Sequence, residues 1–248
     1  MSASLDNEYV LASSLDQNKM VLYRTKTNNK LMQYVGHADT ITACAVNLGS
    51  KQVVSGSDDR TVRYWDMLSA KQVRSDSCPN QINNIDLSAS ELQLATCHMN
   101  DIRIWSTKHG KVIATLQGAH HDAVTCAKFT PDENAIISTG KDNTVKIWDV
   151  KTWKQIGSSW EHEAYSCPSS GAIRNKSEFC ISPNGQYIVV GSSNGCVFVM
   201  DIKSGAIQVE EVYEEHIASV VGCAWMPQTK TSAFATIDKS GGLYVWKN

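Results

Sequence analysis

The sequence predicts an all-β propeller, and three observations lead to this fold class. The dozen residues SGSDDRTVRYWD at 55–66 recur as STGKDNTVKIWD at 138–149, and ATCHMNDIRIWS at 95–106 is a partial copy. The aromatic or apolar residue near the end of each repeat returns after 42, 40, 43, 52 and 46 residues, at Tyr23, Trp65, Trp105, Trp148, Met200 and Trp246. A period of about 40 to 45 residues is typical of four-stranded propeller blades. Helical periodicity is sustained nowhere in the chain.

Each repeat is expected to contain four short strands in the same order. Innermost strands are predicted at TITACAV, HDAVTCAKF and SVVGCAW, and second strands at QVVSGS, NAIISTG, YIVVGSS and SAFATI. TVRYWD, TVKIWD, CVFVMD and GLYVW alternate as third strands do, and KQVRS, KVIATLQ and AIQVEEV supply outer strands. Turn signals such as PDEN, SDDR, GKDN and KSGG separate them.

The expected blades occupy approximately residues 1–35, 36–77, 78–117, 118–158, 159–211 and 212–248. Only eight residues precede Tyr9 in the first blade, so we expect this blade to lack its inner strand. The last blade ends with its third strand and lacks an outer one. Because open strand edges invite aggregation, we expect the chain to be a fragment, a short isoform or a truncated gene model of a longer protein. The parent ring is then expected to have seven blades.

Composition narrows the function classes. The net charge is −2 with dispersed basic residues, which argues against nucleic-acid binding. No apolar run approaches the roughly 18 residues of a membrane span, and the N-terminus has no secretory signal. The eight cysteines include no CxxC pair and fit no zinc pattern, so we expect reduced thiols, no metal and no cofactor. A cytoplasmic location follows as an expectation.

The Gly-His pair at 36–37 and the two strong repeats resemble WD40 repeats, over nearly the whole chain. The resemblance implies a hydrogen-bonded tetrad of His, Ser or Thr, Asp and Trp in each good blade. It implies two complete tetrads: His37, Ser55, Asp59 and Trp65 in blade 2, and His120, Ser138, Asp142 and Trp148 in blade 4. A buried indole N–H needs an acceptor, and such a chain satisfies every polar member. Since the same His, Ser and Asp recur at one position in two blades, we expect scaffolding rather than hydrolysis, and no enzyme.

The other blades are predicted to have incomplete tetrads. Counting back from the tryptophan puts Ala95 and Met99 at the Ser and Asp positions of blade 3, and Ser240 at the Asp position of blade 6. Blade 5 has Met200 in place of the tryptophan, with Asn194 in place of the Asp. Each lost network is expected to remove about 1–3 kcal/mol of satisfied polar interaction.

The C-terminal half resembles the last two blades of autophagy-related sixteen-like proteins. The resemblance rests on AYSCPSSGAIRNKSEFCISPNGQYIVVGSSNGCVFVMDIKSG, followed by EEHIASVVGCAW and ATIDKSGGLYVW. It implies a recognition module acting in autophagosome assembly and in membrane conjugation of ubiquitin-like proteins. Autophagy conjugation machinery or proteins of autophagic or endolysosomal membranes are the implied partners. The alternative is a WD40 adaptor of another pathway, such as a ubiquitin-ligase substrate receptor.

Candidate partner-binding residues lie in turns that can vary without disturbing the blades. The position seven before each repeat aromatic is expected to point outward on the narrow face and to suit a short linear motif with both charge signs: Asp16, Asp58, His98, Lys141, Ser193 and Lys239. The 52-residue step is expected to contain a long loop with interface anchors: Trp160, Tyr165, Arg174 and Lys176. The acidic run VEEVYEEH at 209–216 is either a site for a basic partner or a soluble edge.

Overall fold

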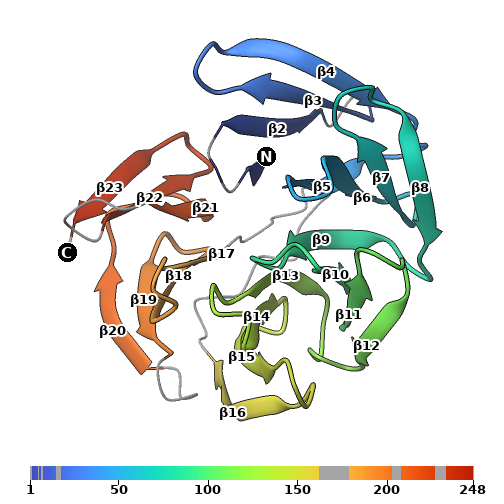
Figure 1. Ribbon diagram of the computed structural model, residues 1–248. Helices are drawn as coiled ribbons and strands as arrows, with labels where there is room; N and C mark the ends of the chain where they lie inside the picture. Colours follow the sequence, from blue (N-terminus) through green and yellow to red (C-terminus); the bar gives the residue numbers. More distant parts are fainter. Residues whose placement is uncertain are drawn as a thin grey trace. The chain divides into compact units, whose positions relative to one another are not determined.

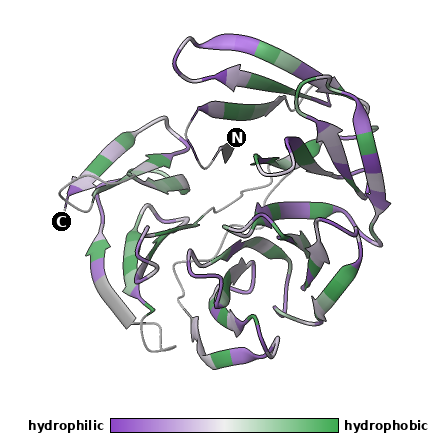
Figure 2. Ribbon diagram, viewed as in Figure 1, coloured by the Kyte–Doolittle hydropathy of each residue, from purple (hydrophilic) through white to green (hydrophobic). Residues whose placement is uncertain are grey.

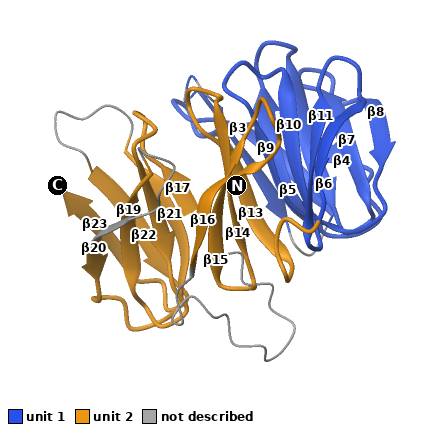
Figure 3. Ribbon diagram, turned by 90° about the horizontal axis from the view of Figure 1, so that it is seen from below, with its two compact units in different colours: residues 1–117 blue, residues 118–248 orange. Residues whose placement is uncertain are grey.

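The structure, a computed structural model, describes residues 2–4, 6, 8–14, 18–161, 179–202, 208–226 and 233–247. These residues form β-strands, turns and bends, and they contain no helix. No helix among them is therefore long and apolar enough to cross a membrane. The strands divide into two compact units, residues 1–117 and 118–248, which Figure 3 colours separately.

Unit 1 contains three antiparallel four-stranded sheets, and in each one neighbouring strands along the chain are also neighbours in the sheet. The first sheet has the strands β1 (Ser2–Ala3), β2 (Tyr9–Ser14), β3 (Lys19–Arg24) and β4 (Asn29–Val35). The second has β5 (Ile41–Asn47), β6 (Gln52–Ser57), β7 (Thr61–Asp66) and β8 (Gln72–Ser77), and the third has β9 (Ile82–Leu87), β10 (Gln93–His98), β11 (Asp101–Ser106) and β12 (Val112–Leu116). Figure 1 shows these meanders in blue to green.

Unit 2 repeats this arrangement. Its first sheet has β13 (Val124–Phe129), β14 (Ala135–Gly140), β15 (Thr144–Asp149) and β16 (Gln155–Glu161), and the next has β17 (Phe179–Ile181), β18 (Tyr187–Gly191), β19 (Val197–Asp201) and β20 (Gln208–Tyr213). The last sheet has three strands among the described residues, β21 (Val220–Trp225), β22 (Ala233–Asp238) and β23 (Leu243–Lys247). Six successive antiparallel meanders of this size are propeller blades, so the predicted all-β propeller class is confirmed. We number the blades 1 to 6 in chain order.

Blade 1 differs from the expectation at its inner edge. Ser2 and Ala3 form the short strand β1, and they pair with Leu11 and Val10 of β2. The expectation that blade 1 has no inner strand is therefore wrong. Two residues suffice because each of them has a pairing partner on β2.

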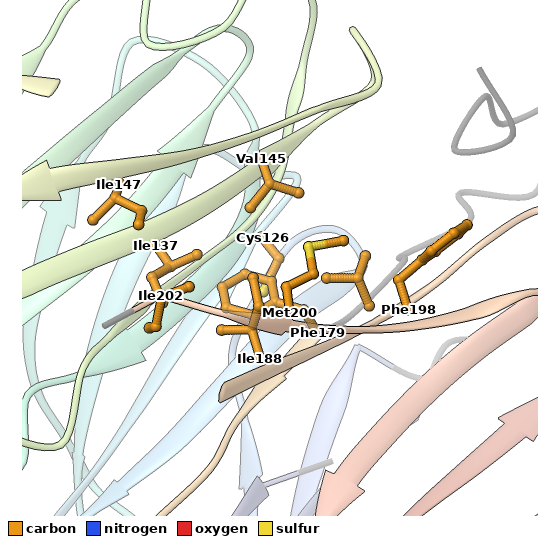
Figure 4. Close-up of a cluster of buried hydrophobic side chains, with 10 residues drawn as sticks. Cys126, Ile137, Val145, Ile147, Phe179, Ile188, Phe198, Met200 and Ile202 are labelled. Atoms are coloured by element: carbon orange, nitrogen blue, oxygen red, sulfur yellow. The ribbon is translucent and has the colours of Figure 1, made fainter. Parts of the chain in front are cut away.

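The hydrophobic pattern explains how the sheets pack. Figure 2 shows hydrophobic residues on strands of every sheet, whereas hydrophilic residues cover much of the outer strands β4 and β8. Within unit 2, side chains of β13, β14 and β15 pack against those of β17, β18 and β19 in one buried cluster (Figure 4). Ile137, Ile188 and Met200 of this cluster have no exposed surface. Sheet faces that interlock in this way hold adjacent blades together.

The long step between blades 4 and 5 is partly regular structure. The sequence predicts Trp160 in a loop, but Trp160 belongs to β16, which pairs with β15 through Trp160 opposite Val145. That expectation is wrong because strand pairing satisfies the backbone groups of this segment. Residues 162–178, with Tyr165, Arg174 and Lys176, lie outside the described residues.

Candidate interaction surface

Blade 2 contains a continuous hydrogen-bonded network. The indole Nε1 of Trp65 donates to Ser55 Oγ over 2.9 Å, and Ser55 Oγ lies 2.7 Å from His37 Nε2. His37 Nδ1 lies 2.7 Å from Asp59 Oδ2. A neutral imidazole in this position donates from Nδ1 to the carboxylate and accepts the serine hydroxyl at Nε2. The serine oxygen then keeps a lone pair for the indole, so every member is satisfied.

The protonation states of Asp59 and His37 stabilise the hydrogen-bonded network of blade 2. Burial favours the neutral form of Asp59, but hydrogen bonds from Thr61, His37 and the Ala38 amide outweigh it and lower the pKa of Asp59 to about 2. Burial lowers the pKa of His37 despite the neighbouring carboxylate. The pair is therefore a carboxylate and a neutral imidazole near neutral pH. Because Asp59 also accepts the amides of Ala38 and Thr61, the network fixes both the loop before β5 and the turn before β7.

Blade 4 repeats this geometry. Trp148 Nε1 donates to Ser138 Oγ over 2.8 Å, Ser138 Oγ lies 2.7 Å from His120 Nε2, and His120 Nδ1 lies 2.9 Å from Asp142 Oδ1. Asp142 accepts the His121 amide over 2.8 Å and the Thr144 hydroxyl over 2.8 Å. Burial opposes ionisation, yet the bonds and charge of His120 lower the pKa of Asp142 strongly.

Blade 6 has a complete network, which corrects the expectation that Ser240 leaves it incomplete. Trp246 Nε1 donates to Thr236 Oγ1 over 2.8 Å, and Thr236 Oγ1 lies 2.6 Å from His216 Nε2. The carboxylate comes from Asp238, whose Oδ2 lies 2.8 Å from His216 Nδ1. Ser240 donates its hydroxyl to Asp238 over 2.6 Å, and this bond is the main cause of the lowered pKa of Asp238.

Gly242 makes this relocation of the carboxylate possible. Thr61 and Thr144 occupy the corresponding position in blades 2 and 4, four residues before the tryptophan. A Cβ atom on Gly242 would lie only 2.7 Å from Asp238 Oδ2, so a threonine there would displace the carboxylate. In blade 4 the small residue is instead Gly140, where a Cβ would lie 2.5 Å from His120 Nδ1.

Blade 3 has a shorter network that uses Thr96 and His98. Trp105 Nε1 donates to Thr96 Oγ1 over 2.7 Å, and this oxygen lies 2.7 Å from His98 Nε2. The expectation that Ala95 takes the hydroxyl position is wrong, because the turn between β10 and β11 has two residues where that of blade 4 has three. Counting back from the tryptophan therefore misses by one residue.

A simple register rule would have found all four hydroxyl residues. Each is the fourth residue of its second strand, counted from the first residue of β6, β10, β14 or β22. In blades 1 and 5 the same position holds Ala12 and Val190, and no tetrad forms among their described residues. Met200 of blade 5 is buried in the apolar cluster of Figure 4 instead.

The six expected turn positions do not all reach the surface. His98 is 1% exposed and faces Thr96, so the expectation that it points outward is wrong. Asp58 is buried with 9% exposure, while Asp16 lies outside the described residues. Ser193 is half-buried, and Lys141 and Lys239 are exposed. In unit 2, the described turn positions are therefore two exposed lysines and one half-buried serine. The expected mixture of positive and negative side chains is not found among them.

Two other expected features have mixed outcomes. Trp160 is half-buried, and its ring packs 5.5 Å from that of Phe198, so it belongs to the core edge rather than to a free loop. Glu211, Glu214 and Glu215 are exposed, and Glu211 accepts the Tyr213 hydroxyl. The side chain of Glu210 lies outside the described ones.

A family comparison agrees with the repeated networks. The sequence model described as "WD domain, G-beta repeat" matches residues 28–66, 110–149 and 171–201. The three matched segments are similar to WD40 repeats. The matched ranges do not include blade 6, although its network is complete.

Known proteins are similar to this chain at low identity. Autophagy-related protein 16 of Arabidopsis thaliana is 27% identical over 99% of this chain, and protein tipD of Dictyostelium discoideum is 27% identical over all of it. The nuclear distribution protein nudF of Aspergillus flavus is 31% identical over 47% of the chain. The chain spans less than half the length of each of these three relatives, namely 46%, 39% and 26%. The predicted resemblance to autophagy-related sixteen-like proteins is confirmed as a resemblance.

The networks of blades 2 and 4 contain no accessible nucleophile. Ser55 and Ser138 have no exposed surface, and the side chains of His37 and His120 have none either. A buried serine oxygen that already accepts an indole N–H and donates to an imidazole cannot reach a substrate. These residues therefore position turns, and their chemistry is structural.

Proposed function

We propose that this chain is a non-enzymatic protein-interaction platform, the recognition module of an autophagy-related sixteen-like protein. It acts in autophagosome assembly and in membrane conjugation of ubiquitin-like proteins, at autophagic or endolysosomal membranes. The similarity to autophagy-related protein 16 over 99% of this chain supports the pathway. The WD40 fold supports the role, because variable turns on a rigid scaffold are suited to binding.

The proposed location of the binding surface is supported by two lysines in equivalent turns. Lys141 and Lys239 occupy the same turn position in blades 4 and 6, and both are exposed. Their amides donate to Ala123 O over 2.8 Å and to Ser219 O over 3.0 Å, while the neighbouring Asp142 and Asp238 anchor each turn through its network. Each turn therefore presents its ammonium group from a preorganised backbone, which lowers the entropy lost on binding.

This surface favours a short acidic motif in a partner protein. Among the described residues, the accessible members of the expected turn set are Lys141, Ser193 and Lys239, and none of these three is anionic. Charge complementarity of this kind mainly sets specificity and the association rate. The candidates Tyr165, Arg174 and Lys176 stay part of the proposal as further contacts of the same partner.

The test is affinity capture with the whole chain as bait in lysate of its own organism. The variant Lys141→Glu with Lys239→Glu reverses both charges, and Lys151→Glu with Lys154→Glu reverses two exposed lysines in the turn at the other end of blade 4. We expect autophagy conjugation factors with the parent chain and the control variant, and loss of most of them with the first variant. Capture of ubiquitin-ligase subunits instead would favour the adaptor alternative, and equal capture by all three baits would refute the lysine surface.

A further inference from the structure

A pocket of about 570 Å³ opens between blades 2 and 3 of unit 1. Its lining includes Asn47, Ser50, Tyr64, Arg74, Leu92 and Lys108. β6 begins in this pocket at Gln52 and ends at Ser57 beside the blade 2 network, so the pocket lies at the opposite end of the strands from that network. A volume of this size fits a few residues of a peptide or a small molecule.

The carboxylate of the pocket, Glu91, already accepts hydrogen bonds from the protein. The carboxylate of Glu91 accepts the amides of Leu48 over 2.9 Å and of Gly49 over 2.5 Å. The carbonyl oxygen of Glu91 accepts Asn47 Nδ2 over 3.1 Å and the Thr107 hydroxyl over 2.9 Å. Glu91 thus joins the turns of blades 2 and 3, and each of its carboxylate oxygens already accepts one backbone amide.

Arg74 is held by its neighbours, and two of its nitrogens, Nε and Nη2, have no hydrogen-bond partner among the described residues. Its guanidinium carbon lies 3.6 Å from the centre of the Tyr64 ring, and Nη1 donates to Thr107 O over 3.1 Å. Nε lies 2.9 Å from Asp76 Oδ2. Gly110 packs against the guanidinium, since a Cβ there would lie 2.8 Å from its central carbon. Nη2 is buried and has no hydrogen-bond partner among the described residues.

Tyr64 provides a further unused donor. It lines the pocket with 2% exposure, and its hydroxyl is buried with no hydrogen-bond partner among the described residues. Burial raises the pKa of Tyr64 to about 12, so the phenol keeps its proton. A buried hydroxyl without a partner is destabilising, and such groups are uncommon unless a ligand or water completes them.

The rim combines a cation with apolar side chains. Lys108 is exposed and has no partner in the part of the chain that the structure describes. Val73 and Leu92 are 57% and 61% exposed beside it. Large exposed apolar residues around a pocket with polar groups are typical of protein-binding sites.

We propose that this pocket binds a peptide segment of a partner protein that carries a carboxylate next to a large apolar side chain. Lys108 Nζ, Arg74 Nη2 and the Tyr64 hydroxyl donate to the carboxylate, and Val73 and Leu92 contact the apolar group. A cationic segment is disfavoured because the donors that face it would be the cationic side chains of Lys108 and Arg74. The site is independent of the turn lysines proposed above, so either proposal can fail alone.

The experiment titrates the ¹⁵N-labelled 248-residue chain with acetyl-Leu-Glu-Leu-amide and follows the amide signals of Gly49, Leu92 and Lys108. Acetyl-Leu-Gln-Leu-amide has the same shape without the charge, and inorganic phosphate has charge without the apolar groups. We expect a saturable shift with the Glu peptide and about tenfold weaker binding for each of the other two probes. No saturable shift below about 10 mM of the Glu peptide would overturn the proposal. Equal binding of the Gln peptide, or of phosphate, would also overturn it.

Variants separate a ligand contact from a structural role. Tyr64→Phe keeps the ring on Arg74 and removes only the hydroxyl, so we expect about tenfold weaker binding of the Glu peptide with an unchanged or higher Tm. Lys108→Gln should weaken binding by about fivefold, whereas Lys151→Gln in blade 4 should have no effect. If Tyr64→Phe changes Tm but leaves binding intact, the hydroxyl is no ligand donor and the proposed site is wrong.

Discussion

The imidazole of His98 is buried, and no carboxylate forms a hydrogen bond with it among the described residues. Its Nε2 faces Thr96, while its Nδ1 is buried and has no partner among the described residues. Burial is the main cause that lowers the pKa of His98 to about 4, and the neighbouring Arg103 lowers it further. The nearby backbone of Asn80 and Gln81 and the Asp101 carboxylate oppose the shift only in part. Blade 3 is therefore built around a neutral histidine.

This pKa predicts a loss of stability in mild acid. The ordinary pKa of histidine is about 6.5, so the unfolded chain takes up a proton before the folded one as the pH falls. The free energy of unfolding should drop between about pH 6.5 and pH 4 and level off below, by about 3 kcal/mol at most from this residue. Chemical denaturation across this range measures it.

The variant His98→Gln removes the titrating group. We expect its free energy of unfolding to vary less over the same pH window, whereas His109→Gln, at an exposed histidine, should follow the parent chain. Parallel pH profiles for all three proteins would show that His98 does not titrate as its burial requires.

At the scale of the element, blades 4 and 6 solve one packing problem in two ways. The turn of blade 4 has Gly140, Asp142 and Thr144, and that of blade 6 has Asp238, Ser240 and Gly242 at the same positions. In both turns the carboxylate reaches the histidine because a glycine leaves the space, two residues before the aspartate in blade 4 and four residues after it in blade 6. The glycine and the aspartate therefore occur in opposite order in the two turns.

This coupling predicts the effect of exchanging the turns. Gly242→Thr alone should lower the free energy of unfolding by about 1–3 kcal/mol, because its Cβ would overlap the Asp238 carboxylate. Combining it with Asp238→Gly and Ser240→Asp rebuilds the blade 4 turn and should restore most of the loss. Thermal and urea unfolding of the single and triple variants check this, and a neutral single variant would refute the steric coupling.

The sequence allowed the strands to be predicted better than the networks. Alternating runs such as TVRYWD and TVKIWD gave β7 and β15, because period-two alternation and Asp-containing turns are local properties. The networks of blades 3 and 6 were missed because they depend on turn length and on the space beside a glycine. Thr96 and Asp238 became visible only once strand register was known.

At the scale of the whole molecule, the blades bury most of the described thiols. Cys44, Cys78, Cys97, Cys126 and Cys180 are buried, whereas Cys196 and Cys223 are half-buried. Burial raises the pKa of Cys78 to about 12, which suppresses its thiolate form.

Thiol labelling therefore reports on the intact fold. We expect the five buried cysteines to react with an aromatic disulfide reagent only after denaturation, and Cys196 and Cys223 to react faster in the native chain. Peptide mapping of the labelled positions with time measures this, with the denatured chain as the reference. Rapid native labelling of Cys97 or Cys126 would mean that the core of a blade opens easily.

The different position of the carboxylate in blade 6 affects how such repeats are detected from sequence. The turn of blade 4 has the sequence S-x-G-x-D-x-T, and that of blade 6 has the sequence T-x-D-x-S-x-G. Both nevertheless complete the same chain of hydrogen bonds. A sequence profile that scores each alignment column independently penalises the blade 6 sequence at several columns. It does not take into account that the change of the aspartate position is compensated by the change of the glycine position. A sequence pattern that accepts either of the two turn sequences, but not a mixture of them, would detect repeats with a complete hydrogen-bonded network that otherwise score as degenerate.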